Sequence, residues 1–244
     1  MPSRRQLAVA AGLFVLTLLV RLPLGWCVGL LPAALNCVGA SGTVWSGRCA
    51  SVGRAPLQLQ EVGWRLEPWL LLAGRLGALV HSDDSRAPLD AELRFGPGGR
   101  IELRDVKGSV ALEAGLLPLF PENWGGTLQL DVARAGLRGG SLQDIAGVLR
   151  VAGLRTRRGG SDLGNYELRF AGADADGNIE GALRDTGGPL EVAGRLRLGR
   201  DGSYELGGTA RARPGAPADL AAALEALGAA DASGRRSFSL AGSF

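Results

Sequence analysis

The side chains that could carry out chemistry are few in this sequence, and their spacing does not assemble a catalytic group. His81 is the only histidine, and it directly precedes Ser82, Asp83 and Asp84. A Ser–His–Asp mechanism needs three groups that converge in space, and neighbours along one short segment do not meet that need. We therefore predict a polar loop here, and a protein without enzymatic activity, catalytic residues or cofactor.

The acidic and thiol side chains do not follow a metal-binding pattern. Asp83-Asp84 and Asp174-Ala175-Asp176 carry neighbouring carboxylates, but neither has the spacing of a calcium loop. The three cysteines lie ten and twelve residues apart along the chain, which is not a zinc pattern, and no histidines accompany them. We interpret the aspartates as turn formers and predict no metal site.

The three cysteines all fall within the first fifty residues, at Cys27, Cys37 and Cys49. In an oxidising compartment an odd number leaves one free thiol. A bridge between Cys37 and Cys49 would close a short loop and contribute up to roughly 3 kcal/mol in the chain-entropy model. We predict this bridge, with Cys27 left over; two free buried thiols are the alternative.

A short motif lies between the last two cysteines and reads Gly-Thr-Val-Trp-Ser-Gly. Gly42 and Gly47 permit sharp turns or close packing, while Thr43 favours a strand. Trp45 can bury a large apolar area, and Ser46 follows it. Two interpretations stay open: a first β-hairpin packed by the tryptophan, or a knob that docks a partner.

The N-terminal segment predicts a membrane anchor. Arg4 and Arg5 precede an uncharged apolar stretch over residues 7–20. Arg21 can direct its side chain to the interface, which extends the span to Trp26 in the headgroup region. The early arginines favour a cytoplasmic N-terminus. The alternative is a cleaved signal peptide, since the lengths of its basic and apolar parts also fit.

This anchor divides the chain into three parts: a cytoplasmic N-terminus at residues 1–6, a transmembrane helix at 7–26, and a β-rich domain at 27–244 outside the cytoplasm. Within the last part, apolar and polar residues alternate in short runs separated by Asp-Gly and Gly-Gly pairs, which are signals for hairpins. Glycine makes up 39 of 244 residues, and the glycines are scattered between the short apolar runs, as is typical of turns. The runs include 57–66, 89–95, 101–104, 106–113, 126–133, 179–184 and 190–198.

We predict a mainly β fold: an antiparallel meander of about ten strands, as either a sandwich or a curved open sheet with an apolar concave side. One short C-terminal helix is expected over Ala218–Leu227, because Leu220, Leu224 and Leu227 form one stripe. A helical turn or an apolar corner is expected at Pro68–Gly74.

The charge pattern argues against nucleic-acid binding. The net charge is only +3, and arginines alternate with Glu and Asp along the predicted strands. Aromatic residues make up 5% of the chain, and no stacking platform accompanies the basic residues. We interpret these charges as solvated faces of strands.

The chain resembles the type II secretion system protein N family. The resemblance runs nearly end to end and rests on the N-terminal anchor and on short segments in matching order: 31–32, 41–47, 62–66 with 68–69, 126–130, 163–166, 185–190 with Gly194, 202–204, 227–228 and 234–235. The Gly-Thr-x-Trp-Ser-Gly core within 42–47 is short, but the order and spacing of the rest make the match specific.

This resemblance implies a bitopic inner-membrane protein with a periplasmic β-rich domain. It implies an accessory or scaffold subunit of the machinery that exports folded proteins across the outer membrane, with other inner-membrane subunits of that complex as partners. The β-rich part is also similar to AsmA-type envelope proteins, which implies an alternative function as a groove that binds or transfers lipid.

Overall fold

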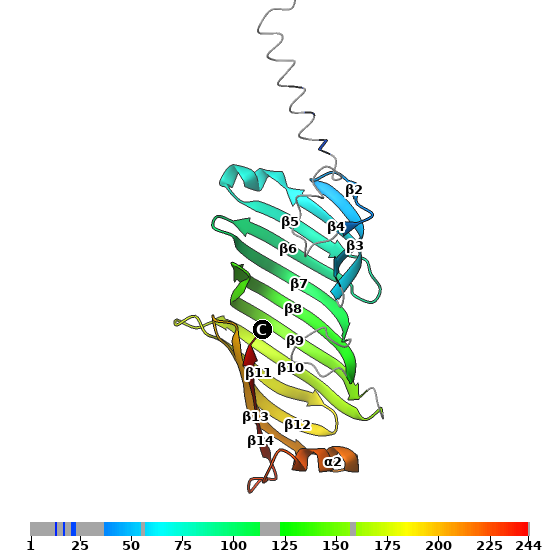
Figure 1. Cartoon of the computed structure of the whole chain (residues 1–244), viewed down its shortest axis with the longest axis vertical. Helices are drawn as coiled ribbons and strands as arrows, with labels where there is room; N and C mark the ends of the chain where they lie inside the picture. The colour runs from blue at the N-terminus through cyan, green and yellow to red at the C-terminus, as the bar shows by residue number, and fades with distance from the viewer. Residues whose placement is uncertain are drawn as a thin grey trace, which may run out of the picture.

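The computed structural model describes residues 37–54, 57–112, 123–156 and 160–243, together with residues 13, 17, 21 and 22. Within these residues the chain forms one antiparallel sheet of 14 strands, in which the strands follow one another in chain order from β3 to β14 (Figure 1). β1 and β2 both pair with the outer side of β3. The predicted antiparallel meander is therefore confirmed, and the open sheet, not the sandwich, is the architecture.

The strands lengthen toward the middle of the sheet. They are β1 (Cys37–Val38), β2 (Ser41–Gly42), β3 (Ser46–Arg54), β4 (Leu57–Glu67), β5 (Leu76–Ser82), β6 (Leu89–Gly96), β7 (Arg100–Leu112), β8 (Trp124–Arg138), β9 (Ser141–Thr156), β10 (Asp162–Ala173), β11 (Ile179–Gly187), β12 (Leu190–Leu198), β13 (Ser203–Ala212) and β14 (Arg236–Ser243). A 3-10 helix, η3 (Pro68–Ala73), connects β4 to β5, and α2 (Ala218–Glu225) precedes β14.

The register of the strands places apolar side chains on one face of the sheet. Opposed residues in neighbouring strands point to the same face, and successive residues in one strand alternate. Leu130 of β8 lies opposite Leu149 of β9, which lies opposite Leu168 of β10. On the other face Gln129 lies opposite Arg150, which lies opposite Glu167. One face is therefore apolar and the other charged.

Among the described residues other than glycine, Glu61 and Asp105 have positive φ, and Asp105 marks an irregularity in this alternation. Asp105 has φ 48° and lies inside β7, beside a register shift between β6 and β7. The sequence predicts two strands here, at 101–104 and 106–113; the structure instead forms one strand that continues through the irregularity. An extra residue in a strand shifts which side chains face the core without ending the strand.

The clusters of buried apolar residues among the described residues lie in the C-terminal half. Leu220 of α2 packs against Leu154 and Leu163, while Leu224 packs against Val192 and Ala210. The helix therefore covers part of the apolar face near the last strands. The predicted helix is confirmed, although it ends at Glu225 and Leu227 lies beyond it, 43% exposed.

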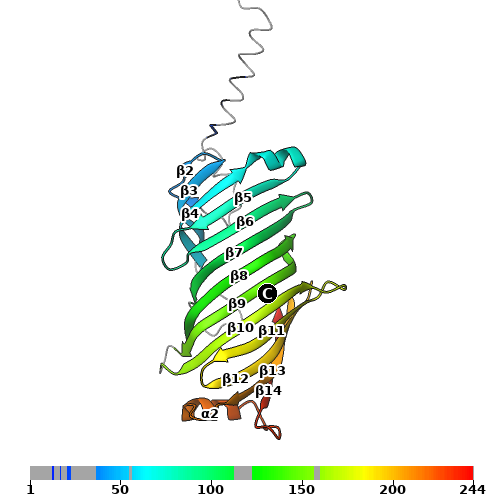
Figure 2. The ribbon, with the colours of Figure 1, turned by 180° about the vertical axis from the view of Figure 1, so that it is seen from behind.

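The sheet changes direction toward its C-terminal end. Strands β4 to β10 lie side by side along the long axis, whereas β13 and β14 turn out of that surface (Figures 1 and 2). Open sheets of more than about ten strands generally curl or split, because the twist between neighbours accumulates. Here the sheet curls, and side chains from β10 to β14 join in one cluster with α2.

The predicted anchor at residues 7–26 lies almost wholly outside the described residues, as do Arg4, Arg5 and Trp26. In the part of the chain that the structure describes, no helix has the length and the apolar character that a membrane crossing requires. Arg21 is described and exposed, and its backbone N–H donates a hydrogen bond to the carbonyl oxygen of Thr17 at 2.9 Å. The anchor and the three-part division of the chain stay predictions.

Candidate interaction site around residues 42–47

The Gly42–Gly47 motif forms a tight turn between β2 and β3. Ser41 pairs with Arg48, and Gly42 pairs with Gly47. The backbone N–H of Thr43 donates a hydrogen bond to the carbonyl oxygen of Ser46 at 2.9 Å, and the N–H of Ser46 donates to Oγ1 of Thr43 at 3.2 Å. Thr43 and Ser46 therefore satisfy each other's backbone groups across the turn.

Glycine is required at position 42 by two features of the turn. Its φ is +93°, a conformation that residues with a Cβ rarely adopt. A Cβ at this position would also lie 2.6 Å from the carbonyl oxygen of Ser46. The first glycine of the motif is therefore explained by local geometry alone.

The second glycine makes room for a tryptophan of the neighbouring strand. Gly47 lies opposite Trp64 of β4, and a Cβ at position 47 would lie 2.6 Å from Cζ2 of the Trp64 ring. The indole N–H of Trp64 donates a hydrogen bond to the carbonyl oxygen of Val44 at 3.0 Å. Trp64 thus packs over the glycine and holds the turn, a role that sequence analysis did not assign to it.

Trp45 is half-buried, and its carbonyl oxygen accepts a hydrogen bond from the N–H of Leu66 at 2.7 Å. This bond joins the tip of the turn to β4. The turn is therefore held to β4 at both Val44 and Trp45. Whether the Trp45 side chain docks a partner stays a prediction.

A disulfide joins Cys37 and Cys49, with the two Cα atoms 5.7 Å apart. It links β1 to β3, which also pair through Cys37 with Val52 and Val38 with Ser51. Cys49 is 2% exposed. The bridge therefore fastens the short N-terminal strands to the sheet. Cys27 lies outside the described residues.

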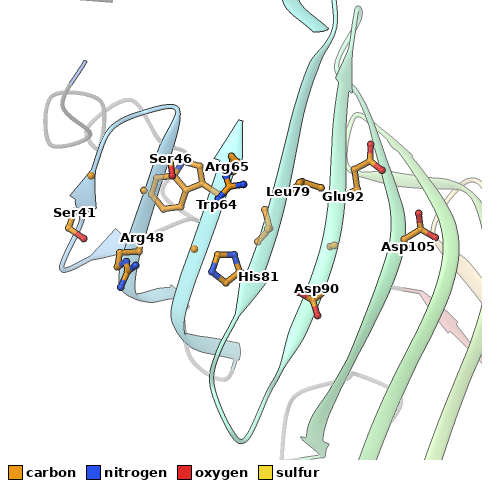
Figure 3. A pocket seen from close by; sticks show the side chains of 15 residues that line it. Ser41, Ser46, Arg48, Trp64, Arg65, Leu79, His81, Asp90, Glu92 and Asp105 are labelled. Atoms are coloured by element: carbon orange, nitrogen blue, oxygen red, sulfur yellow. The ribbon is translucent and has the colours of Figure 1, made fainter. Parts of the chain in front are cut away.

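A groove with a volume of about 950 Å³ extends from the motif across β2 to β7 (Figure 3). Gly42, Ser46 and Gly47 of the motif line it. Basic or imidazole side chains line the groove from β3 to β5, namely Arg48, Arg65 and His81. Carboxylates line it from β6 and β7, namely Asp90, Glu92 and Asp105. The groove therefore has a basic side next to the motif and an acidic side away from it, a distribution that suits a polypeptide segment carrying both charges.

The only histidine is not arranged for nucleophilic catalysis with its neighbour. His81 and Ser82 are successive residues of β5, so they lie on opposite faces of the sheet. The Ser82 hydroxyl donates a hydrogen bond to the carbonyl oxygen of Gln60 at 2.9 Å. The prediction of a polar loop at 81–84 is wrong for the first two residues, because β5 continues to Ser82.

The described residues contain no group of three or more His, Cys, Asp and Glu side chains that could hold a metal ion. Asp174 accepts hydrogen bonds from the backbone N–H groups of Gly177 and Asn178, the first through its carbonyl oxygen at 3.0 Å and the second through Oδ1 at 2.8 Å. This carboxylate therefore stabilises a turn.

The charged face contains a buried carboxylate surrounded by arginines. Glu167 is 4% exposed, and it accepts hydrogen bonds from Arg150 at 3.1 Å, Arg169 at 3.1 Å and Arg184 at 2.6 Å. Burial raises the pKa of Glu167, but the hydrogen bonds from Arg169, Arg184 and Arg150 outweigh burial and hold that pKa below its usual value. The carboxylate therefore stays ionised and joins β9, β10 and β11.

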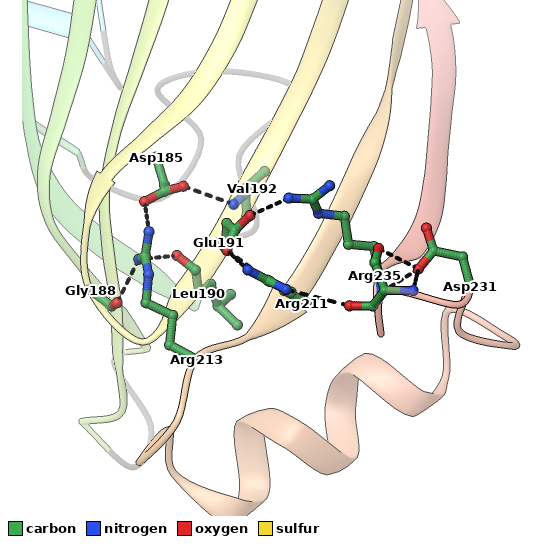
Figure 4. Close-up of polar contacts among 10 residues, drawn as sticks. Asp185, Gly188, Leu190, Glu191, Val192, Arg211, Arg213, Asp231 and Arg235 are labelled. Atoms are coloured by element: carbon green, nitrogen blue, oxygen red, sulfur yellow. Dashed lines mark hydrogen bonds and ion pairs between the residues drawn. The ribbon is translucent and has the colours of Figure 1, made fainter.

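Further ion pairs bind the last strands together (Figure 4). Glu191 of β12 pairs with Arg211 of β13 at 2.5 Å and with Arg235, just before β14, at 2.7 Å. Hydrogen bonds from Arg235 and Arg211 lower the pKa of Glu191. Arg213 pairs with Asp185 at 2.5 Å. These contacts lie within the fold, so we interpret them as structural.

The sequence of the chain matches a known protein family. The family model described as "Type II secretion system (T2SS), protein N" matches residues 33–239. The chain is also similar to a type II secretion system protein N from Aeromonas hydrophila, with 29% identity over 245 residues, covering 95% of this chain and 96% of that protein. No solved structure matches the chain.

Proposed function

Because the chain belongs to the type II secretion system protein N family, we propose that it is a non-catalytic scaffold subunit of that machinery. In this proposal residues 7–26 anchor it in the bacterial inner membrane, with residues 1–6 in the cytoplasm and 27–244 in the periplasm. Its partners are other inner-membrane subunits of the complex, and its role is in the export of folded proteins across the outer membrane.

The observation that carries the scaffold role is the construction of the β-rich part. In the part of the chain that the structure describes, a single sheet of 14 strands presents a long surface and two strand edges. On the charged face, the ion pairs around Glu167 join three neighbouring strands and so help to fix the sheet. Such a surface suits contacts with several neighbours.

The groove beside the motif is the contact site that we propose for one of these partners. Gly42, Ser46 and Gly47 line it, and Trp45 lies at the tip of the same turn. The disulfide and the Trp64 hydrogen bond fix this turn before any partner arrives. Pre-organisation of this kind lowers the entropic cost of association.

Deletion of the chain in its host tests the role in export. We expect secretion of the substrates of the system to fall, and to return when the full chain is restored. Export that continues unimpaired for all substrates would count against the scaffold role. A reporter fused after Phe244 tests the placement separately: activity only in the cytosol would contradict the periplasmic assignment.

Photo-crosslinking in cells tests the contact site. A photoreactive residue at position 45 is expected to capture another subunit of the secretion complex. Trp69 offers a matched control, because it is the same residue type and is 63% exposed on η3. Equal capture from both positions would show that exposure, and not the motif, governs the contact.

A lipid-binding groove is the second candidate function, favoured by the apolar face. Leu93, Leu103, Leu130 and Leu149 lie on this face in four successive strands, β6 to β9, and each is only half-buried. An open sheet leaves such side chains available to acyl chains, whereas a filled sandwich would not.

Mass spectrometry of lipid extracted from the purified full chain tests this second function. We expect co-purified phospholipid, reduced by Leu130→Gln on the apolar face and unchanged by Gln129→Ala on the charged face. A preparation free of phospholipid, or equal amounts in both variants, would exclude the lipid groove and leave the scaffold role untouched.

A further inference from the structure

The two edges of the sheet are built differently. At the N-terminal edge, β1 and β2 pair with the outer side of β3, each over only two residues, and the Cys37–Cys49 disulfide fastens them. At the C-terminal edge, β14 runs for eight residues and pairs with β13. Among the described residues, no strand pairs with its outer side.

β14 also lacks the features that usually protect an exposed edge. Natural edge strands are short, bulged, interrupted by proline or supplied with charges, because their unpaired backbone groups otherwise bind another strand. β14 contains no proline, pairs with β13 without a register shift, and carries one charge, Arg236, at its first residue. Leu240 at its centre is 46% exposed.

The sequence of β14 is complementary to itself when two copies run antiparallel about Leu240. In that register Phe238 lies opposite Gly242 of the partner subunit, and Leu240 lies opposite its own copy. The intervening Ser239 lies opposite Ala241 of the partner subunit. Small residues thus face small residues, and Phe238, the aromatic residue within β14, faces a glycine.

The same pairing rule already operates between β13 and β14. Tyr204 lies opposite Gly242, Leu206 opposite Leu240, and Gly208 opposite Phe238. A Cβ at Gly208 would lie 2.9 Å from Cζ of Phe238, so the ring occupies the space that the glycine leaves. Cross-strand pairs of this kind stabilise a sheet. We propose that β14 pairs with β14 of a second copy of this chain, joining two sheets into one about a two-fold axis at Leu240.

Geometry and charge favour this partner. The pairing opposes residues of the same face, so the apolar faces of the two copies lie on one side and their charged faces on the other. The two copies of Arg236 lie at opposite ends of the paired segment, so like charges are not opposed. Because the two subunits use the same surface, this interface is complete with two copies and does not extend to a third. The N-terminal edges, formed by β1 and β2, then lie at the two outer ends of the joined sheet.

Strand pairing at β14 needs neither the membrane anchor nor another secretion subunit, so it goes beyond the proposed function and does not rest on it.

The test uses the full chain in a Cys27→Ser background that keeps the Cys37–Cys49 bridge. Leu240→Cys introduces a single thiol at the proposed axis. Ala193→Cys is the matched control, on the exposed charged face of the interior strand β12.

Each variant is treated with a short bismaleimide and separated on a denaturing gel. Opposed Cβ atoms in paired strands lie about 5 Å apart, within reach of the reagent. We expect Leu240→Cys to give a product of twice the 25.2 kDa chain, at a yield about fivefold or more above Ala193→Cys, because only the edge residue meets its own copy. Equal yields, or capture of a protein of another mass, would overturn the proposal.

Sedimentation of the full chain carrying Leu240→Lys supplies a second measurement. In a dimer, two lysines would lie opposite each other at the axis, and their like charges would repel. We therefore expect Leu240→Lys to shift the dimer to monomer. Because position 240 is exposed in the single chain, we expect the melting temperature of Leu240→Lys to stay near that of the parent. A parent chain that is already monomeric, or a dimer that the lysine leaves intact, would contradict pairing at β14. Either result would leave the conclusion from the secretion assay unchanged, because that assay measures export and not strand pairing.

Discussion

The indole N–H of Trp64 donates a hydrogen bond to the carbonyl oxygen of Val44 at 3.0 Å, and so ties the 42–47 turn to β4. The same ring occupies the space above Gly47. A single side chain therefore connects the turn to the sheet in two ways, by the hydrogen bond of its N–H group and by packing against Gly47. The conformation of the proposed contact site depends on this residue.

Replacing Trp64 separates these two contributions. Trp64→Phe keeps most of the packing and removes the hydrogen bond, so we expect the free energy of unfolding to fall by about 1 kcal/mol. Trp64→Ala also opens a cavity, and a loss of about 2–4 kcal/mol is expected for this half-buried ring. Chemical denaturation of the full chain measures both. Trp69→Phe, at an exposed position, serves as the control and should change stability little.

Adding one methyl group at Gly47 tests the contact from the other side. The new Cβ would lie 2.6 Å from the Trp64 ring and 3.0 Å from two backbone carbonyl oxygens, so Gly47→Ala is expected to destabilise the chain by about 1–3 kcal/mol. Gly136→Ala is the matched strand control, because its Cβ would meet only Cβ of Asp144 at 3.8 Å. A similar loss in both variants would show that the cost is general to strand glycines.

Neutralising Glu167 should weaken the charged face more than neutralising an exposed acid. In Glu167→Gln the three arginines lose the negative charge and one of the two acceptor oxygens, and because these arginines are partly exposed they can be rehydrated. We expect a loss of about 1–3 kcal/mol, typical of charge-assisted hydrogen bonds. Glu180→Gln removes an exposed pair with Arg197 and should cost less than about 1 kcal/mol. Thermal unfolding of Glu167→Gln and Glu180→Gln measures both losses, and equal losses would contradict a special role of Glu167.

Stability is expected to depend on pH in the acidic range through Glu167 and Glu191. Both carboxyl groups have a pKa below the usual 4.5 in the folded chain. Their contribution is therefore fully present above the pKa of the unfolded chain, and it is lost as the pH falls below 4.5 toward the lower folded pKa. Denaturant midpoints at a series of pH values measure this loss. Glu167→Gln should flatten the curve; an unchanged curve would remove Glu167 as a cause.

Opening the Cys37–Cys49 disulfide should loosen the N-terminal edge. The bridge spans 12 residues, and the chain-entropy model assigns such a loop about 3 kcal/mol. We expect Cys37→Ser to lower the melting temperature, together with faster hydrogen exchange in β1 to β3. Cys27→Ser is the control variant. If both substitutions have the same effect, the bridge is not the source of the stability.

The alternation of apolar and polar residues was enough to locate most of the sheet. Leu89–Phe95 and Leu190–Leu198 alternate cleanly, and both are strands with nearly the same bounds. Alternation fails at Asp105: the apolar residues occupy odd-numbered positions up to Leu103 and an even-numbered position at Val106. A break of phase in a sequence looks like the end of a strand, although the backbone continues through it.

The contacts within the candidate site could not be predicted from the sequence. The pairing of Gly47 with Trp64 follows from the register of β3 on β4, which distant parts of the sheet help to set. Glu167 looked like one of many acids that alternate with arginine, and only the register brings Arg150 and Arg184 to its two sides. A glycine and a tryptophan separated by seventeen positions carry no local signal of contact.

The consecutive order of the strands has a consequence for how the chain acquires its structure. From β3 onward each strand finds its hydrogen-bonding neighbour immediately before it in the chain, so no strand has to wait for a distant segment. Contacts between near neighbours close small loops and speed folding. The sheet can therefore grow one strand at a time in the direction of synthesis, and β14 is the last of the described strands to be added.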